Sequence, residues 1–271
     1  MVRQVFAVLL VIIGFAGGAL AADRAEMRRF LEVTGFDVAI TSMRESAKAG
    51  PALTGDAANT FAHSYEELVD QIFVPEEMLG RALDMMEAVM PAALVEYGIG
   101  FYGSDLGQRL VAVENASHMT PDAERMALGE EIVAQLMEAN PARIKDYRAM
   151  QEAIGGTDTS LAALIEIQLR YIMAADAARG EQTYSEDELR TLLMQSEPQM
   201  RAHLDSYALV ASAYAYRDIP DADIKAYREV LESDEMRQVY EILNAVQNEI
   251  MAERYETLAA ELAKLPPVQS L

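Results

Sequence analysis

The sequence predicts an all-α protein folded as a helical bundle, and two observations support this fold class. Beyond an apolar N-terminal segment, apolar residues recur at the spacing of helical faces along almost the whole chain, and no alternating stretch of useful length predicts a strand. Residues that commonly begin helices also precede many of these faces. A chain of 271 residues is long enough to bury a sizeable core, so one domain is the simplest interpretation.

The N-terminal segment, MVRQVFAVLLVIIGFAGGALAAD, has the three-part layout of an export signal. Arg3 supplies a positive start, Val5 to Phe15 form an apolar run, and Ala19-Leu20-Ala21 form a small-residue cleavage site. We therefore expect residues 1–21 to be a signal peptide, residues 22–271 to be the mature all-α domain, and the protein to be periplasmic. The alternative is a retained membrane anchor, because the apolar stretch approaches the roughly 20 residues that a spanning helix needs.

The composition excludes several classes of function. The chain has 44 acidic and 22 basic residues, a formal net charge of −22, and loss of residues 1–21 would make that charge one unit more negative by removing Arg3. Such a charge repels phosphate backbones and anionic lipids, so we expect no nucleic-acid binding and no membrane binding after signal cleavage. Because there is no Cys, an exported chain of this kind has no disulfides and depends on packing for stability.

Helix starts and breaks divide the chain into elements. Ser64 with Glu67, and Ser185 with Glu188, have the spacing of capping boxes. Four prolines stand where a first helical residue is expected, namely Pro75, Pro121, Pro141 and Pro220. Breaks are predicted at Gly35 and over residues 49–56, 155–158, 178–184 and 265–267.

Two stretches of the chain resemble each other. Residues 101–116, FYGSDLGQRLVAVENA, share Ser-Asp and Asn-Ala at matching places with residues 230–245, VLESDEMRQVYEILNA. We interpret them as parts of two diverged helical repeats, over about residues 25–117 and 154–247, with connecting helices over 120–153. The shared positions are Ser104/Ser233, Asp105/Asp234, Asn115/Asn244 and Ala116/Ala245.

The first of these stretches predicts a helix that starts after Ser104. The Ser104 side chain can accept a hydrogen bond from an early backbone N–H, and Asp105 places a negative charge at the positive end of the helix dipole. Gly107 costs about 1 kcal/mol relative to Ala inside a helix, so its presence predicts that another backbone passes close by. Gly103 is expected in the turn before the helix. The predicted core faces are Leu106, Leu110 and Val113 in this stretch, and Met236, Val239, Tyr240 and Leu243 in the second.

At these residues the sequence resembles a known family. Phe101-Tyr102, Ser104 and Gly107-Gln108-Arg109 resemble the signature of the bacterial exported family catalogued as domain of unknown function 2059, and Thr34-Gly35 resembles its upstream element. The chain departs from that family at Asp105, where the family usually has Pro, and in having MPAALVEY where the family has an acidic helix start. The resemblance implies an α-helical envelope protein, and it implies no catalytic residue and no ligand.

No other motif predicts chemistry. The three histidines, His63, His118 and His203, lack the spacing that brings metal ligands onto one helical face. Ser104 in GSDLG does not have the flanking glycines or the preceding strand of a nucleophile elbow. Residues 220–224, PDADI, lack the Gly and the final Glu of a calcium loop. We therefore assign no catalytic, cofactor-binding or metal-binding residue, and no cofactor.

The methionines and tyrosines are compatible with a binding function. The spacing of a core face is found at Met78, Ala82, Met85 and Val89. The wider methionine cluster also includes Met86 and Met90. The alternatives for this cluster are an adaptable peptide-binding groove and a copper site. Tyr207, Tyr214 and Tyr216 could line a pocket. We therefore expect a non-catalytic factor that binds an envelope protein or peptide. The alternatives are a small-molecule carrier with an apolar cavity and an enzyme with a dispersed active site, and the oligomeric state is not predicted.

Overall fold

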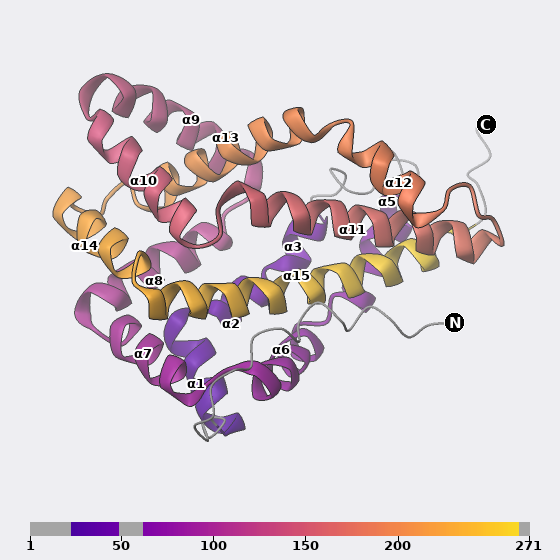
Figure 1. Ribbon diagram of the computed structural model, residues 1–271, viewed down its shortest axis with the longest axis horizontal. Helices are drawn as coiled ribbons and strands as arrows, with labels where there is room; N and C mark the ends of the chain where they lie inside the picture. Colours follow the sequence, from indigo (N-terminus) through magenta and orange to yellow (C-terminus); the bar gives the residue numbers. More distant parts are fainter. Residues whose placement is uncertain (1–22, 49–61, 266–271) are drawn as a thin grey trace.

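The computed structural model describes residues 23–48 and 62–265, and over this part of the chain the all-α prediction is confirmed (Figure 1). No strand occurs among these residues. The predicted signal peptide, the break at 49–56 and most of the break at 265–267 lie outside the described residues. Among the helices that are described, none is both long enough and apolar enough to cross a membrane.

For description, we divide the helices into two sets in chain order, with one helix between them. The first set is α1 (Arg24–Thr34), α2 (Phe36–Thr41), α3 (Met43–Lys48), α5 (Ala62–Ile72), α6 (Pro75–Val89), α7 (Ala92–Tyr102) and α8 (Asp105–His118). The connecting helix is α9 (Asp122–Ala139). The second set is α10 (Pro141–Ala153), α11 (Gly156–Arg179), α12 (Glu186–Met194), α13 (Glu197–Ala215), α14 (Asp221–Leu231) and α15 (Asp234–Leu262). We call α1–α8 the first half and α10–α15 the second half.

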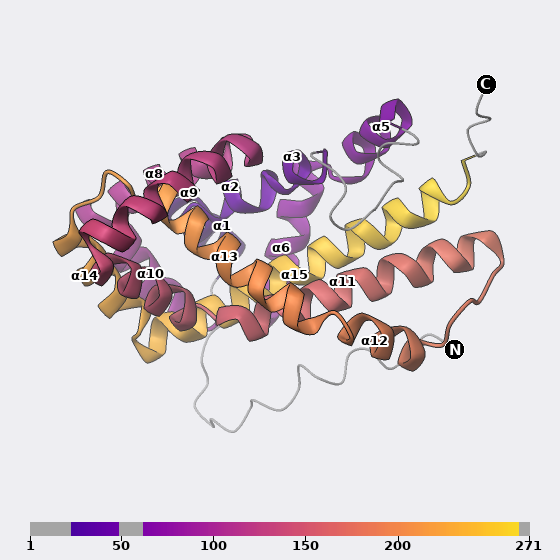
Figure 2. The ribbon, with the colours of Figure 1, turned by 90° about the horizontal axis from the view of Figure 1, so that it is seen from above.

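The long helix α15 runs through the middle of the molecule beside α11 in both views (Figures 1 and 2). It packs against α11 of its own half and against α5, α6 and α7 of the first half. Its apolar residues recur every three or four positions, which places them on one broad face. The predicted face of α15 is confirmed by the buried side chains Met236, Val239, Tyr240 and Leu243. The core is therefore shared between the halves.

Ion pairs to α15 also cross between elements. Arg81 of α6 binds both carboxylate oxygens of Glu253, with a shortest distance of 2.6 Å. Arg170 of α11 binds Glu249 and Glu256, at 2.9 and 2.6 Å. Each guanidinium keeps partial exposure, so these pairs fix the orientation of neighbouring helices more than they add stability.

Two glycines of the family-like signature, Gly107 and Gly35, allow close contacts between helices. Gly107 is buried, and a Cβ added to it would lie 2.3 Å from the Phe101 carbonyl oxygen at the end of α7. This confirms the prediction that a backbone passes close to Gly107. Gly35 has φ +76° between α1 and α2, and a Cβ there would lie 2.7 Å from Oδ1 of Asn115 on α8. Both glycines therefore hold α8 tightly against its neighbours.

Most predicted helix boundaries are confirmed. Ser104 and Ser233 cap α8 and α15 by accepting from the Gly107 and Met236 N–H groups, and Ser185 forms a complete capping box with Glu188. The capping box at Ser64 is wrong, because α5 already includes Ala62, so Ser64 lies within its first turn. Pro75 and Pro141 begin α6 and α10, whereas Pro121 and Pro220 stand one residue before α9 and α14.

The methionines of α6 belong to the core. Met78, Met86 and Met90 are buried, so packing explains them without a surface groove. The predicted face is rotated, however, because Val89 is 39% exposed and the buried positions are Met78, Ala82, Leu83 and Met86. Val89 is the last residue of the helix, and the core continues at the next residue, Met90.

Candidate functional site

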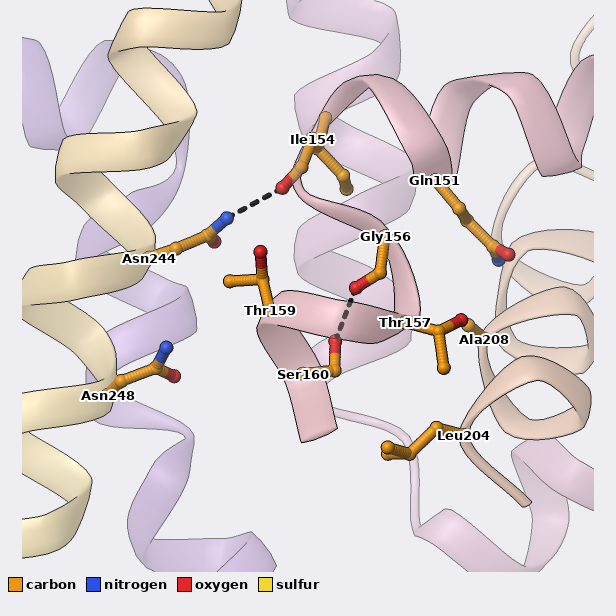
Figure 3. A pocket seen from close by; sticks show the side chains of 10 residues that line it. All are labelled: Gln151, Ile154, Gly156, Thr157, Thr159, Ser160, Leu204, Ala208, Asn244 and Asn248. Carbon is orange, nitrogen blue, oxygen red and sulfur yellow. Dashed lines mark hydrogen bonds between the residues drawn. The ribbon is translucent and has the colours of Figure 1, made fainter. Parts of the chain in front are cut away.

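A small cavity with both polar and apolar lining lies where α10 ends and α11 begins (Figure 3). Its volume is about 160 Å³. Asn244 and Asn248 of α15 line one side, and Leu204 and Ala208 of α13 line the other. The start of α11 lies between them and contributes hydroxyl groups. The remaining lining residues are Gln151, Ile154, Gly156, Thr157, Thr159 and Ser160.

The chain needs two left-handed glycines to form this cavity. Gly155 and Gly156 have φ values of +118° and +61° and reverse the chain between α10 and α11. Asn244 then donates to the Ile154 carbonyl at 2.6 Å, which satisfies one acceptor at the end of α10. Within the described residues, the side chains of Thr159 and Asn248 make no hydrogen bond. The cavity thus offers neutral polar groups, and it is smaller than the roughly 300 to 1,000 Å³ of typical small-molecule pockets.

A second polar cluster lies between the halves and consists of four buried tyrosines and one half-buried carboxylate. Oε1 of Glu114, on α8, accepts hydrogen bonds from the hydroxyls of Tyr216 at 2.7 Å and Tyr227 at 3.1 Å. The Tyr227 hydroxyl also lies 3.0 Å from that of Tyr102 and 3.2 Å from that of Tyr240. Tyr102 and Tyr240 are 2.6 Å apart. We call these five residues the Glu114 cluster.

Burial changes the acidity of every member of the Glu114 cluster. Desolvation raises the pKa of Glu114 to about 7, although the hydrogen bonds from Tyr216 and Tyr227 act in the opposite direction. Desolvation likewise raises the pKa of each tyrosine hydroxyl, so all four remain protonated at neutral pH. Glu114 is therefore the one member that changes charge near neutral pH.

Arg143 of α10 positions one of the tyrosines. Its guanidinium is buried and donates to the carbonyls of Tyr216 and Ile219, both at 2.6 Å, which fixes the turn between α13 and α14. The same side chain donates to the Tyr147 hydroxyl at 2.8 Å and pairs with Asp221. A buried guanidinium needs this many acceptors to offset its desolvation.

The surface carries exposed apolar side chains on or beside two helices, α9 and α12. These side chains are 40 to 65% exposed, and the two helices lie toward opposite ends of α13 (Figures 1 and 2). We call the two surfaces together the α9/α12 edge, and it consists of Met119, Leu128 and Met137 at α9 and of Leu192 and Met194 at α12.

The residues singled out from the sequence are not brought together. His118 and His203 are exposed on different helices, the side chain of His63 lies outside the described part, and no group of acidic and histidine residues within that part could hold a metal ion. The Ser104 hydroxyl caps α8. Tyr207 packs between α9 and α13 with Arg125, whereas Tyr214 lines a second cavity of about 60 Å³.

Sequence reasoning missed Glu114, although the sequence held a signal for it. The buried stripe of α8 runs through Gly107, Leu110, Val111 and Ser117, and Glu114 falls on it at helical spacing. A carboxylate on an apolar stripe needs partners, and Tyr240 of a predicted core face and Tyr216 of the predicted pocket are residues that could supply them.

The chain matches no protein-family model, and no curated protein and no solved structure matches it.

Proposed function

We propose that this protein is a non-catalytic factor of the periplasm that binds a protein or peptide partner of the cell envelope. The observation that carries the proposal is the distribution of large exposed apolar side chains. Seven of the eight in the described residues fall between positions 119 and 194, and the eighth is Val89. They include Met119, Leu128 and Met137 on or beside α9 and Leu192 and Met194 on α12. Exposed apolar side chains that lie near one another on a surface are typical of sites where partners bind.

The charge around the α9/α12 edge indicates the chemistry of the partner. Acidic side chains are exposed along both helices, and the arginines Arg125 and Arg190 are already paired with Asp122 and with Glu166 and Glu186. A basic amphipathic segment fits this surface, since its apolar side chains cover the methionines and leucines and its cations meet the acids. The exposed acids are Asp122, Glu124, Glu130, Glu131, Glu138, Glu186, Asp187 and Glu188.

The other two functions have less support. A carrier of apolar molecules needs a cavity large enough for its cargo, whereas the larger cavity described above has a volume of only about 160 Å³. An enzyme needs perturbed acidic or basic groups that reach a cleft. Glu114 is strongly perturbed, but its partners are tyrosines buried in the core.

We also propose that the chain consists of two diverged repeats. Matching features of the helices in the two halves support this. Helices α7 and α14 each have 11 residues and each follow a proline, Pro91 or Pro220. The next helices both start after a capping Ser. The left-handed glycines Gly35 and Gly155 each lie against an asparagine, Asn115 or Asn244, at the matched position of the Ser-Asp helix.

This correspondence moves the proposed start of the second repeat. It does not test the resemblance to the exported family, which stays a prediction. Helix α10 matches α1, because each is followed by a left-handed glycine, so the second repeat starts near Pro141 and α9 alone connects the two. In the first half, the residues that resemble the exported family lie at and around the start of α8. Gly107 packs on Phe101, and Gln108 donates to the Tyr102 carbonyl at 2.7 Å. The signature thus has a structural role in this chain.

Site-specific photo-crosslinking in the envelope tests the proposed function. A photoreactive residue is placed at Met137 or Leu192, with Val89, the last residue of α6, as the matched exposed control. We expect one basic partner to be captured from 137 and 192 but not from 89, and capture to fall with added salt. Equal capture from all three positions, or none from 137 and 192, would contradict partner binding at this edge.

The location is tested separately. Intact-mass measurement on the native protein should give a mature chain that begins at Ala22, released with the osmotic-shock fraction. A chain that retains residues 1–21 and sediments with membranes would instead support the anchor alternative.

A further inference from the structure

We propose that Glu114 is a protonation switch that makes the packing of the two halves pH-dependent. Glu114 and Tyr102 belong to the first half, whereas Tyr216, Tyr227 and Tyr240 belong to the second. The Glu114 cluster therefore joins the halves at a point where one group can gain or lose a charge.

Hydrogen-bond geometry shows that the cluster accommodates a proton without losing a contact. The hydroxyls of Tyr216 and Tyr227 both reach Oε1 of Glu114. Within the described residues, Oε2 makes no hydrogen bond and is not fully buried. A proton that binds Oε2 thus leaves both tyrosine hydrogen bonds in place and converts the carboxylate to a neutral acid. The protonated form keeps the contacts and no longer carries a charge in this partly desolvated site.

The ionised form lacks a counter-charge. Glu114 forms no ion pair with any described residue, and the groups that face it from α7, α13, α14 and α15 are the four tyrosine hydroxyls. Helices α1 and α2 also pack on α8, and there Asp37 interacts with Glu32. His118, one turn further along α8, faces Arg125 of α9. An unpaired carboxylate between packed helices favours opening of the contact toward water.

The direction of the pH effect follows from linkage. The folded pKa of Glu114, about 7, lies above the ordinary value of 4.5. A carboxyl group with a raised folded pKa stabilises the fold fully below its unfolded pKa, and that contribution is lost as pH rises through the folded pKa. The halves should therefore be joined most tightly when Glu114 is protonated, and the contribution should disappear between about pH 4.5 and pH 7.

Thermal melts of Glu114→Gln against wild type across pH 5 to 8 test the switch. Gln keeps the size and an acceptor oxygen and carries no charge. We expect the variant to melt close to wild type at pH 5 and several degrees higher at pH 8. Two controls are Glu124→Gln, an exposed acid on α9, and His118→Gln, the nearest histidine. Neither should show a difference from wild type that grows with pH in this way.

Two further readouts separate a switch from a merely structural role. Because the chain has no Trp, near-ultraviolet circular dichroism reports on Tyr and Phe, and in wild type it should change with a midpoint near neutral pH and stay flat in Glu114→Gln. In Tyr216→Phe, the Glu114 side-chain carbon resonance should titrate at higher pH than in wild type, because one hydrogen bond that favours ionisation is lost. A wild-type midpoint near 4.5, or a Glu114→Gln offset that is constant with pH, would overturn the proposal.

Discussion

Gly107 shows how a single residue sets the packing of a helix. The sequence alone predicts that a large side chain at this position is harmful and that Ala is nearly neutral. The structure makes Ala harmful too, because even a Cβ would lie 2.3 Å from the Phe101 carbonyl oxygen and 2.5 Å from the Tyr102 Cα. We expect Gly107→Ala to destabilise the fold by about 1 to 3 kcal/mol, as overpacking does, and Gly107→Leu to cost more.

Gly80 provides the matched control for this prediction. It lies inside α6, and a Cβ there would meet nothing within 4 Å. Gly80→Ala should stabilise the protein by up to about 1 kcal/mol, since only helix propensity changes. Urea unfolding followed by circular dichroism measures both variants. Equal effects at positions 80 and 107 would show that the contact with α7 carries no energy.

The structural role of some residues can be predicted from the sequence, whereas the role of others cannot. Ser104 and Gly107 were predicted because their roles depend on neighbours within a few positions, such as a helix N–H or an adjoining turn. Glu114 was missed because its partners come from α13 and α14, about a hundred positions away. The cavity between α10 and α11 was missed for the same reason, since it needs the start of α11 to meet α15. Interactions between residues that are near in sequence can be predicted from the sequence. Contacts between helices that are far apart in sequence cannot.

At the scale of elements, α9 depends on one close crossing with α13. Gly129 is the buried residue of α9, and a Cβ there would lie 2.5 Å from the Val210 carbonyl oxygen. We expect Gly129→Ala to push the two helices apart and to destabilise the protein by about 1 to 3 kcal/mol. Partner capture from position 137 should also weaken, because α9 carries Met137. A variant as stable as wild type would show that the crossing can widen freely.

The Ser-Asp helix starts are a second property of elements. Ser104 and Ser233 each accept a hydrogen bond from a backbone N–H three residues on, so replacement of either by Ala should cost about 1 kcal/mol. Ser206 is the control, since it is exposed within α13 and makes no hydrogen bond in the described chain. Chemical denaturation of the three variants checks this. A loss at Ser206 equal to that at Ser104 would argue against capping.

For the whole molecule, charge limits the possible partners. With a net charge of −22, the protein should not bind DNA or vesicles of anionic lipid at physiological salt. A micromolar titration with a duplex and with phosphatidylglycerol vesicles, each read by anisotropy or sedimentation, tests both. Saturable binding to either would mean that a local basic surface outweighs the overall charge.

The last prediction concerns cooperativity, because a duplicated chain could unfold in two steps. Here α15 packs on α5, α6 and α7 as well as on α11, and α13 packs on both α8 and α9. Removing the second half would therefore expose the faces that the first half buries against α15. We expect one urea transition, coincident by far-ultraviolet circular dichroism and by the tyrosine signal in the near ultraviolet. Two separated transitions would mean that each repeat holds its own core and that the shared helix adds little. A single transition at pH 5 that broadens at pH 8 in wild type, but not in Glu114→Gln, would link this cooperativity to the protonation of Glu114.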